Sequence, residues 1–327
     1  MPTADPAPRT AAELIADFLV AQLAAHRQAW RAQHGDATRA PPLVCAIQGP
    51  QGSGKSYTAS KLPALLASAS SSAPTPIRTA ALSLDDLYLP YSGLQAVAAS
   101  DPSNALLSGR GQAGTHDLPL GVSLLTALKR PAPGSNPIAL PVFEKSLNGG
   151  AGDRLPVKEW LQVERPDEVD VVVFEGWMNG FRPLDPPQLL DELYELARMD
   201  PAKARARLGI DYETPFLLEH KQEHLRVVQE NLAEYAALWD MADVFVQIKP
   251  ERMGYVWEWR LQQEHNMKAQ NGGIGMTDEQ VKHFIARYMP GYELFLRGID
   301  DPKSTWAGKG LRVVIDKARD VLGVELF

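Results

Sequence analysis

Five short apolar runs, separated by longer mixed segments, dominate the chain after residue 40. They span residues 43–47, 77–84, 169–174, 244–248 and 313–315. A continuous apolar run is typical of a strand that is buried on both faces of a parallel sheet. Because the runs alternate with helical stretches, they predict an α/β fold of three layers, with helices on both faces of a central, mainly parallel sheet.

Apolar residues at helical spacing predict helices both before the first of these strands and in the C-terminal half of the chain. Near the N-terminus one helix face is formed by Leu14, Ile15, Phe18, Leu19 and Leu23. This stripe predicts an N-terminal helical extension over residues 1–40, ahead of one large domain over residues 41–327. A second stripe has the pattern of a core-facing helix rather than of a cofactor site; it comprises Leu225, Val228, Leu232, Tyr235 and Trp239. Thr277 and Gln280 form a capping box, which predicts the start of a further helix.

Residues 49–56 match G-x-x-x-x-G-K-[ST], the loop that wraps the phosphates of ATP or GTP. Its glycines let successive N–H groups converge on phosphate oxygens. Lys55 is expected to reach the β- and γ-phosphates, and Ser56 to hold Mg²⁺. The loop follows an apolar run and precedes a helix that Pro63 should interrupt early, which favours a nucleotide site over a Gly/Ser-rich surface turn. The predicted ATP-binding residues are Gly49, Pro50, Gln51, Gly52, Ser53, Gly54, Lys55, Ser56 and Tyr57.

Carboxylates follow two of the predicted strands. Asp85 and Asp86 come after the second strand, and Glu175 follows the third. Ligands in open α/β sheets bind beyond the carboxyl ends of the strands, so these acids should lie beside the phosphate loop. One carboxylate can orient Mg²⁺, and another can accept a proton from an attacking hydroxyl. The alternative for Asp85 and Asp86 is a pair that caps a helix.

A long polar stretch from residue 90 to residue 154 is rich in Gly, Pro and Asn. Long loops of this kind are usually binding surfaces or disordered. One cluster of charge in it contains Arg110, His116 and Asp117, and a second contains Lys145 and Arg154. A single loop cation is usually a solvated charge, but two clusters around flexible glycines favour an anionic or polyhydroxy substrate.

A third cationic segment lies in a predicted helix near residues 252–263. Arg260 could close over the triphosphate as part of a helical lid and stabilise charge in the transition state. For Arg252, an exposed position on an amphipathic helix is an alternative. A GTPase would need an N-K-x-D-like element after a strand, whereas residues 249–252 read Lys-Pro-Glu-Arg. The pattern therefore favours an ATP-using kinase.

Composition excludes several other classes. The chain has 327 residues and a net charge of −7, which argues against nonspecific binding to nucleic acid. Its single cysteine, Cys45, excludes an intrachain disulfide and fits a reducing compartment. No apolar run approaches the roughly 20 residues that span a bilayer, and no signal peptide is evident. We expect a cytoplasmic protein without nucleic-acid or membrane partners; a monomer is favoured, although the oligomeric state is not legible in the sequence.

Several motifs together resemble D-glycerate 3-kinase and its fungal kinase-like relatives. They cover residues 49–56, 83–88, 110–117, 145–154, 175–181, 276–281 and 288–290. These proteins are similar to the uridine kinase, phosphoribulokinase and pantothenate kinase group. The resemblance runs from about residue 43 to the C-terminus. It departs at Ala113, where proline is expected, and residues 184–215 match nothing in the pattern.

The resemblance implies a small-molecule kinase that uses ATP and Mg²⁺. Asp85 then corresponds to the base that takes the substrate hydroxyl proton, with Lys55 and Arg260 as further catalytic residues. Glu175 corresponds to the acid near Mg²⁺, and the expected metal ligands are Ser56, Glu175 and Asp86. The expected substrate-binding residues are Asp85, Arg110, His116, Asp117, Lys145 and Arg154; the cation that binds the acceptor carboxylate is left open among Arg110, Lys145 and Arg154.

The function predicted is phosphorylation of a small hydroxylated metabolite, with D-glycerate giving 3-phospho-D-glycerate as the leading assignment. A nucleoside, pantothenate or a sugar is an alternative acceptor, and a non-catalytic ATP-binding protein is a further alternative. The sharpest rival is His220-x-x-Glu223-His224, which fits the H-x-x-E-H pattern of some zinc peptidases with both histidines on one helical face. A polar, solvated helix face explains the same residues more simply.

Overall fold

The computed structural model describes residues 9–36, 38–69, 75–131, 134–270, 272–273 and 275–327. Its central sheet has six strands in the order β10-β9-β8-β1-β7-β2. The strands are β1 (Leu43–Gln48), β2 (Thr79–Ser83), β7 (Val171–Gly176), β8 (Val244–Pro250), β9 (Gly310–Ile315) and β10 (Val321–Leu326). The first five are parallel to their neighbours, and β10 pairs antiparallel with β9. All five predicted strands and the α/β fold are confirmed; β10 is an addition.

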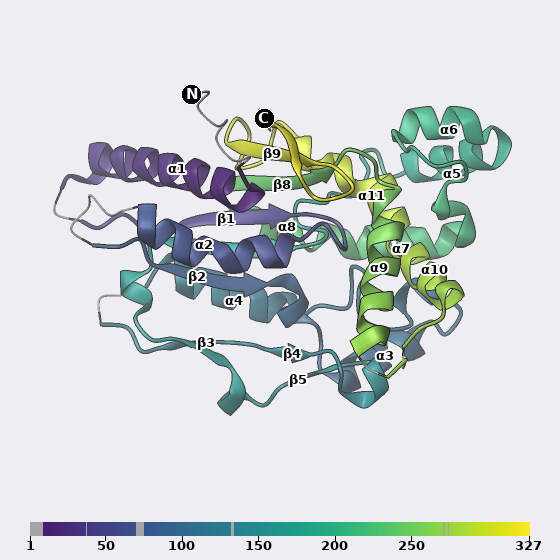
Figure 1. Cartoon of the computed structure of the whole chain (residues 1–327), viewed down its shortest axis with the longest axis horizontal. Coiled ribbons are helices and arrows are strands. Elements are labelled where there is room, and N and C mark those ends of the chain that lie inside the picture. Colours follow the sequence, from purple (N-terminus) through teal and green to yellow (C-terminus); the bar gives the residue numbers. More distant parts are fainter. Residues whose placement is uncertain (1–8, 37, 70–74, 132–133, 271, 274) are drawn as a thin grey trace, which may run out of the picture.

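Two helices cover one face of the sheet (Figure 1). They are α1 (Ala11–His34), which begins with a capping box at Thr10, and α2 (Lys55–Ala69). Ile15, Leu19 and Leu23 of α1 are buried in one cluster with residues of α2 and the sheet. The predicted N-terminal helix is therefore confirmed, while the division of the chain at residue 40 stays a prediction, with residues 1–8 and 37 outside the described part.

Pro63 does not interrupt the helix that follows the phosphate loop, contrary to the expectation from sequence. The helix α2 continues through Pro63 as far as Ala69. Leu62 and Leu66 are fully buried against the sheet on either side of the proline. This burial offsets the local cost of the missing N–H donor.

The opposite face carries α4 (Leu118–Lys129), α7 (Gln222–Ala233) and α8 (Ala236–Trp239), while α5 (Leu189–Met199) packs against α7 away from the sheet (Figure 1). The predicted core stripe lies here and is confirmed, since all five of its residues are buried: Leu225, Val228, Leu232, Tyr235 and Trp239. The short helix α6 (Pro201–Leu208) packs beside α5, and together they project from the body in Figure 1. Residues 184–215, unmatched by the motifs, contain these two helices.

The stretch from residue 90 to residue 154 is more regular than its composition indicates. It contains α3 (Tyr91–Ser100) and α4, and two small ladders pair β3 (Ile138–Leu140) with β6 (Leu161–Val163) and β4 (Phe143–Glu144) with β5 (Asp153–Arg154). Asp117 caps α4 by accepting a hydrogen bond from Leu120 N–H. Leu125 and Leu128 of α4 are buried in the core. The expectation of one long loop was therefore wrong for these segments.

The C-terminal third supplies a wall beside the sheet edge. It consists of α9 (Tyr255–Gln270), α10 (Asp278–Ala286) and α11 (Met289–Phe295) (Figure 1). The capping box of Thr277 and Gln280 starts α10 as predicted. Within the part of the chain that the structure describes, no helix is both long enough and apolar enough to cross a bilayer.

Candidate active site

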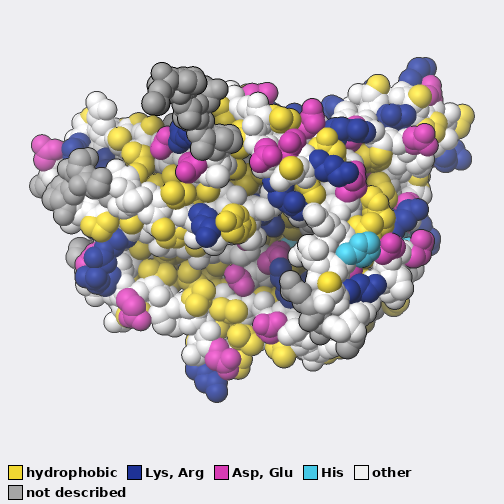
Figure 2. All heavy atoms as spheres, in the orientation of Figure 1, with side chains coloured by type: hydrophobic (Ala, Val, Ile, Leu, Met, Phe, Trp, Pro, Cys, Tyr) yellow, Lys and Arg dark blue, Asp and Glu magenta, His cyan; other side chains and the backbone are white. Residues whose placement is uncertain are grey.

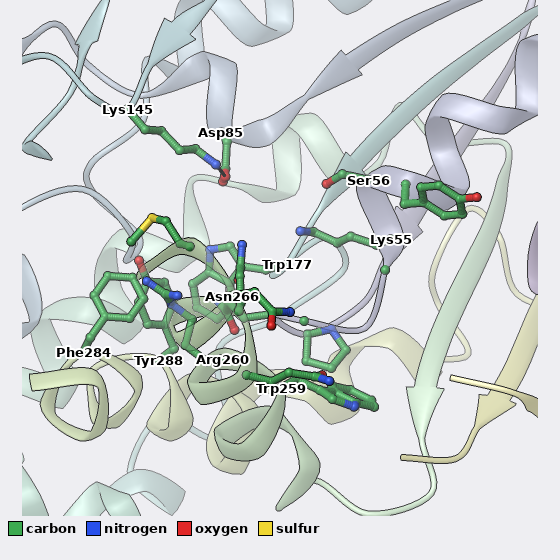
Figure 3. A pocket seen from close by; sticks show the side chains of 18 of the residues that line it. Lys55, Ser56, Asp85, Lys145, Trp177, Trp259, Arg260, Asn266, Phe284 and Tyr288 are labelled. Carbon is green, nitrogen blue, oxygen red and sulfur yellow. Dashed lines mark hydrogen bonds and ion pairs between the residues drawn. The ribbon is translucent and has the colours of Figure 1, made fainter. Parts of the chain in front are cut away.

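A cleft of about 800 Å³ opens where the phosphate loop, the carboxyl ends of β2 and β7, and helices α9 and α10 meet. Figure 2 shows a depression near the middle of this face, with acidic and basic side chains lying close together in it. Lys55, Ser56 and Asp85 line the cleft on the sheet side, whereas Arg260 and Phe284 line it on the helical side (Figure 3). The strand-end carboxylate Asp85 and the phosphate loop therefore share one cleft, as the parallel topology predicts.

The phosphate loop is held from outside by three contacts. Gly52 has φ +80°, and a Cβ at this position would lie 2.4 Å from Cβ of Trp259 on α9. Arg319, in the turn between β9 and β10, donates from Nε to the carbonyl of Gly52 at 2.7 Å. Tyr292 of α11 donates its hydroxyl hydrogen to Oε1 of Gln51 at 2.5 Å. The loop conformation thus depends on residues far away in the sequence.

Glu175 forms a polar centre beneath the loop. Its Oε1 accepts hydrogen bonds from the hydroxyls of Ser56, at 3.0 Å, and Ser83, at 2.8 Å. Lys55 Nζ lies 3.7 Å from its other oxygen, Oε2. That oxygen is buried and accepts no hydrogen bond among the described residues. A buried carboxylate oxygen without such a partner, next to the Ser56 hydroxyl, is the donor set that Mg²⁺ prefers, so these residues fit a magnesium ion.

Asp85 and Lys145 form an ion pair at the entrance to the same cleft, with Lys145 Nζ 2.6 Å from Asp85 Oδ2 (Figure 3). Burial would raise the pKa of Asp85, but the charges of Lys145 and Lys55 outweigh burial and lower that pKa to about 2. Conversely, burial works against a charged Lys145, yet Asp85 raises the pKa of the ammonium group. Both groups are charged at neutral pH, which gives the cleft an ionised carboxylate and an ammonium group that can be displaced from it.

Arg110 also lines the cleft, together with the cations Lys55, Lys145, Arg260 and Arg319. Its Nη1 donates to the carbonyls of Gly150 and Ala151, each at 2.6 Å, and its guanidinium lies over the Phe143 ring. These contacts join the two charge clusters that the sequence shows in separate segments. Tyr88, Trp177 and Tyr288 add aromatic surface to the same cleft.

Seven predicted site residues lie outside the lining of this cleft: Gly49, Ser53 and Glu175 at the phosphate loop, and Asp86, His116, Asp117 and Arg154 farther out. Arg154 forms an ion pair with Asp117 at 2.9 Å and donates to the Tyr88 carbonyl at 2.7 Å, so the pair ties α4 to β5. The buried His116 stacks on Tyr88, and its Nδ1 lies 2.7 Å from the Tyr235 hydroxyl. These three residues hold the cleft wall together and do not contact the cleft; their predicted substrate contacts have no support in this geometry.

Asp86 also turns away from the cleft. It accepts a hydrogen bond from Phe143 N–H at 3.0 Å, which anchors β4. Burial raises the pKa of Asp86 to about 6 despite that hydrogen bond. Ser83 accepts from Asp85 N–H and caps the 3₁₀ turn Leu84–Leu87 that carries both acids. Of the adjacent pair, Asp85 alone faces the cleft, and the metal role predicted for Asp86 is unsupported.

Arg260 lies in the cleft wall as predicted, but it already has partners there. Its Nη2 is 2.8 Å from Glu264 Oε2, and its guanidinium lies over the Phe284 ring. Arg252 lies outside the lining and pairs with Asp211 at 3.1 Å. Arg260 is therefore positioned beside the cleft, while Arg252 has a structural role.

The zinc-peptidase pattern loses its geometric basis. His220 precedes α7, so it does not share a helical face with His224. Nε2 of His220 lies 3.0 Å from the Ala286 carbonyl, and Nε2 of His224 lies 3.2 Å from the Ser103 hydroxyl. Across the described ranges, no group of three or more His, Cys, Asp or Glu side chains is arranged to hold a metal ion.

Several lining residues carry no signal that sequence reasoning could use. Asn266 and Phe284 come from α9 and α10, and Arg319 comes from a short turn at the far end of the chain. Arg319 has φ +74°, a conformation that its residue type does not announce. Trp177 and Tyr288 fall within the motif segments, which was the one available indication.

Comparison with known proteins resolves the family. No family model matches the chain. The structure of D-glycerate 3-kinase from Cryptococcus neoformans is 44% identical, with a TM-score of 0.81 over 97% of this chain and 99% of that one. The uncharacterized kinase mug58 of Schizosaccharomyces pombe is 34% identical over 78% of this chain and 81% of its own length. This chain belongs to the D-glycerate 3-kinase-like family of P-loop kinases.

Membership of the D-glycerate 3-kinase-like family confirms the resemblance read from the motifs. The chloroplastic D-glycerate 3-kinase of Arabidopsis thaliana is also similar, at 34% identity over 91% of this chain. The match spans 57% of the length of that plant relative. The family is one of small-molecule kinases, so the cleft described above is a candidate site of phosphoryl transfer.

Proposed function

We propose that this protein transfers the γ-phosphoryl group of ATP to a hydroxyl of a small hydroxy acid, with D-glycerate as the acceptor and 3-phospho-D-glycerate as the product. One observation carries the proposal: the Asp85–Lys145 ion pair faces the phosphate loop across a single cleft. An ionised carboxylate suits the hydroxyl that attacks, and the cations suit the carboxylate of the acceptor. The similarity to D-glycerate 3-kinase of Cryptococcus neoformans supports the same substrate.

The transfer needs a base for the acceptor hydroxyl, groups that hold the phosphates in place, and positive charge that neutralises the phosphates. The acceptor hydroxyl oxygen attacks the γ-phosphorus as its proton moves to an Asp85 oxygen. The bond between the γ-phosphorus and the bridging oxygen breaks, and ADP leaves with the electron pair. Lys55 and the loop N–H groups hold the phosphates, since phosphoryl transfer is catalysed mainly by positioning and charge neutralisation.

Ser56 and Glu175 would hold Mg²⁺, which when bound neutralises phosphate charge as a Lewis acid. Lys55 of the phosphate loop forms an ion pair with Glu175, so the loop and this acid are already held together. Arg260 would turn from Glu264 toward the γ-phosphate when α9 and α10 close over the cleft. This makes α9 and α10 the proposed lid.

Lys145 and Arg110 are the proposed partners of the acceptor carboxylate. An incoming carboxylate competes with Asp85 for Lys145, because both are anions within reach of one ammonium group. When Lys145 shifts to the acceptor, Asp85 loses its closest cation and its affinity for a proton rises. The acceptor would in this way activate its own base.

ADP release with D-glycerate, L-glycerate, uridine, pantothenate and sugar phosphates tests the substrate, with the phosphate position read by ³¹P NMR. Highest kcat/KM with D-glycerate, and phosphate on the 3-hydroxyl, are expected. Preference for another acceptor would contradict the substrate assignment. No turnover with any of them would favour an ATP-binding protein without this activity.

The Asp85→Asn variant tests the base. Because general-base catalysis typically contributes 10²- to 10⁴-fold, we expect kcat to fall by about that factor. The Kd for a non-hydrolysable ATP analogue should change little, since Asp85 does not hold the phosphates. Normal turnover by this variant would remove Asp85 from the mechanism.

A further inference from the structure

A second cavity, of about 360 Å³, lies against the phosphate loop. It shares one lining residue with the cleft, Pro50, which belongs to the loop itself. Its other walls come from the carboxyl end of β8, the segment around Ile210, and α11 with the turn that follows it. Cavities of roughly 300–1,000 Å³ are the usual size for metabolite sites, and phosphoryl transfer as proposed above does not use this one.

The floor of this cavity is a row of polar side chains on three neighbouring strands. Gln48 of β1 is in register with Gln247 of β8, which is in register with Arg312 of β9. Gln48 is 1% exposed and Gln247 is 4% exposed. Arg312 donates from Nε to Gln247 Oε1 at 2.5 Å. The residues next to these three on each strand are apolar. A row of three aligned polar side chains therefore stands out within the sheet.

Gln48 has a buried acceptor with no partner. Its Nε2 donates to the Trp177 carbonyl at 2.9 Å, and this contact fixes which end of the amide is which. Its Oε1 is buried and accepts no hydrogen bond among the described residues. A buried acceptor that lacks a donor is costly, so the cavity suits a ligand that brings an O–H or N–H group to Gln48.

The charges around the cavity indicate the sign of such a ligand. Among the acids of its lining, Asp211 pairs with Arg252 and Asp300 with Arg312, whereas Glu251 accepts a hydrogen bond from the neutral Tyr255 hydroxyl and keeps its charge. Lys249 is exposed at the end of β8 and forms no ion pair within the described part of the chain. Arg297 donates to the carbonyl of Arg207, and no carboxylate of the described residues pairs with it. Beside these two ion pairs, the described lining holds two positive charges, Lys249 and Arg297, against the one negative charge of Glu251, which favours a negatively charged ligand.

We propose that this cavity binds a small anion that carries hydroxyl groups, either a hydroxycarboxylate or a hydroxylated phosphate ester, and that this ligand regulates ATP binding. A hydroxyl donates to Gln48 Oε1, and the anionic group lies near Lys249 and Arg297. The ligand packs against Pro50 and against Tyr292, whose hydroxyl holds Gln51 of the phosphate loop. Occupation of the cavity therefore stabilises the loop conformation that receives phosphates, and ATP binds more tightly.

Binding is tested directly, without turnover, by calorimetry with L-tartrate, glycerol 3-phosphate, inorganic phosphate and glycerol. Binding of tartrate or glycerol 3-phosphate, with glycerol and inorganic phosphate at least tenfold weaker, is expected. Tartrate and glycerol 3-phosphate also separate the carboxylate from the phosphate-ester ligand. Equal binding of neutral glycerol, or no binding of any anion at about 10 mM, tenfold above the upper end of typical KM values, would overturn the proposal.

Variants place the bound probe in this cavity rather than in the cleft. Lys249→Glu should raise the probe Kd at least tenfold, and Ile210→Trp, which fills the cavity from its rim, should abolish binding. Lys158→Glu, a charge reversal at an exposed lysine elsewhere, and Lys145→Met in the cleft should leave the Kd within twofold. If Lys145→Met abolishes binding while Lys249→Glu does not, the probe occupies the cleft and the proposal fails.

Coupling to the phosphate loop is measured with a non-hydrolysable ATP analogue. Saturating probe should lower the analogue Kd, and by linkage the analogue should lower the probe Kd by the same factor. The predicted coupling between the two ligands rests on the proposed binding of ATP at the phosphate loop. It does not depend on the acceptor, so it would hold even if D-glycerate were not the acceptor. Unchanged analogue affinity with bound probe would overturn the regulatory role.

Discussion

Lys145 sets the electrostatic state of Asp85. The variant Lys145→Met removes the largest interaction that lowers the Asp85 pKa, so that pKa should rise from about 2. We therefore expect the acid limb of the pH profile of kcat/KM, which reports groups of the free enzyme, to move to higher pH. The kcat/KM for D-glycerate should also fall about 10- to 100-fold, the range for a lost charge-assisted hydrogen bond. Steady-state rates between pH 5 and pH 9 measure both effects.

The matched control for this variant is Lys158→Met, which removes an exposed lysine far from the cleft. It should leave both the pH profile and kcat/KM as they are in the wild type. A Lys145→Met enzyme with unchanged acceptor kinetics would contradict the assignment of Lys145 to the acceptor carboxylate.

Single residues could be placed from sequence where topology fixes their position. Asp85 and Glu175 follow parallel strands, so their meeting at the phosphate loop was predictable. His116 and Arg154 were not, because a charged residue in a loop can face a cleft or brace a wall. Arg154 braces a wall, since its two terminal nitrogens are engaged, Nη1 by Asp117 and Nη2 by the Tyr88 carbonyl. The difference lies in tertiary partners that the local sequence does not specify.

At the level of secondary-structure elements, the contact between the phosphate loop and α9 can be tested with one substitution. Gly52→Ala forces a left-handed φ on alanine and brings its Cβ within 2.4 Å of the Trp259 Cβ, so the helix must move away from the loop. We expect the KM for ATP to rise at least about tenfold, and stability to fall by about 1–3 kcal/mol. Kinetics and urea unfolding measure these two effects separately.

Gly308→Ala is the control for backbone strain alone. Gly308 has φ +72°, and a Cβ there would meet nothing within 4 Å. This variant should lose some stability and keep the wild-type KM for ATP. If Gly52→Ala also keeps that KM, the contact with α9 does not control the nucleotide site.

Helices and strands could be predicted from sequence where burial gives them a regular pattern of apolar residues. Elements without such a pattern could not. The five parallel strands are mainly apolar segments, and the stripe of α1 is regular, so both were predicted correctly. The strand β10 is mostly exposed at the edge of the sheet, so no apolar run marks it. The helix α4 begins beside glycines and prolines that are typical of loops, but its buried leucines hold it on the core.

At the scale of the whole molecule, two hydrophobic clusters sandwich one sheet, and the ligand sites lie where the clusters end. One cluster joins α1 and α2 to the sheet, and the other joins α4, α7 and α8 to it. The phosphate loop lies at the junction, with the cleft on one side and the second cavity against Pro50. We therefore expect a ligand in the proposed second site, like one in the cleft, to act on the loop through the residues that pack against both.

The buried His116 should make the stability of the whole fold depend on pH. Burial lowers its pKa to about 3 despite the nearby Asp85, whereas the unfolded chain binds this proton near pH 6.5. Below pH 6.5 the unfolded state therefore takes up a proton that the folded state refuses, and stability falls. From pH 7 to pH 5 this group alone should cost about 2 kcal/mol.

Urea unfolding of the wild type and of His116→Gln at pH 5, 6 and 7 measures this contribution. The variant lacks the titrating group, so its deficit in unfolding free energy relative to the wild type should shrink by about 2 kcal/mol from pH 7 to pH 5. For His283→Gln, at an exposed position on α10, the difference from the wild type should be the same at each pH. A constant deficit for His116→Gln would mean that this histidine takes up its proton as readily in the folded protein as in the unfolded chain, and the neutral ring stacked on Tyr88 would then be the wrong description of the cleft wall at pH 5.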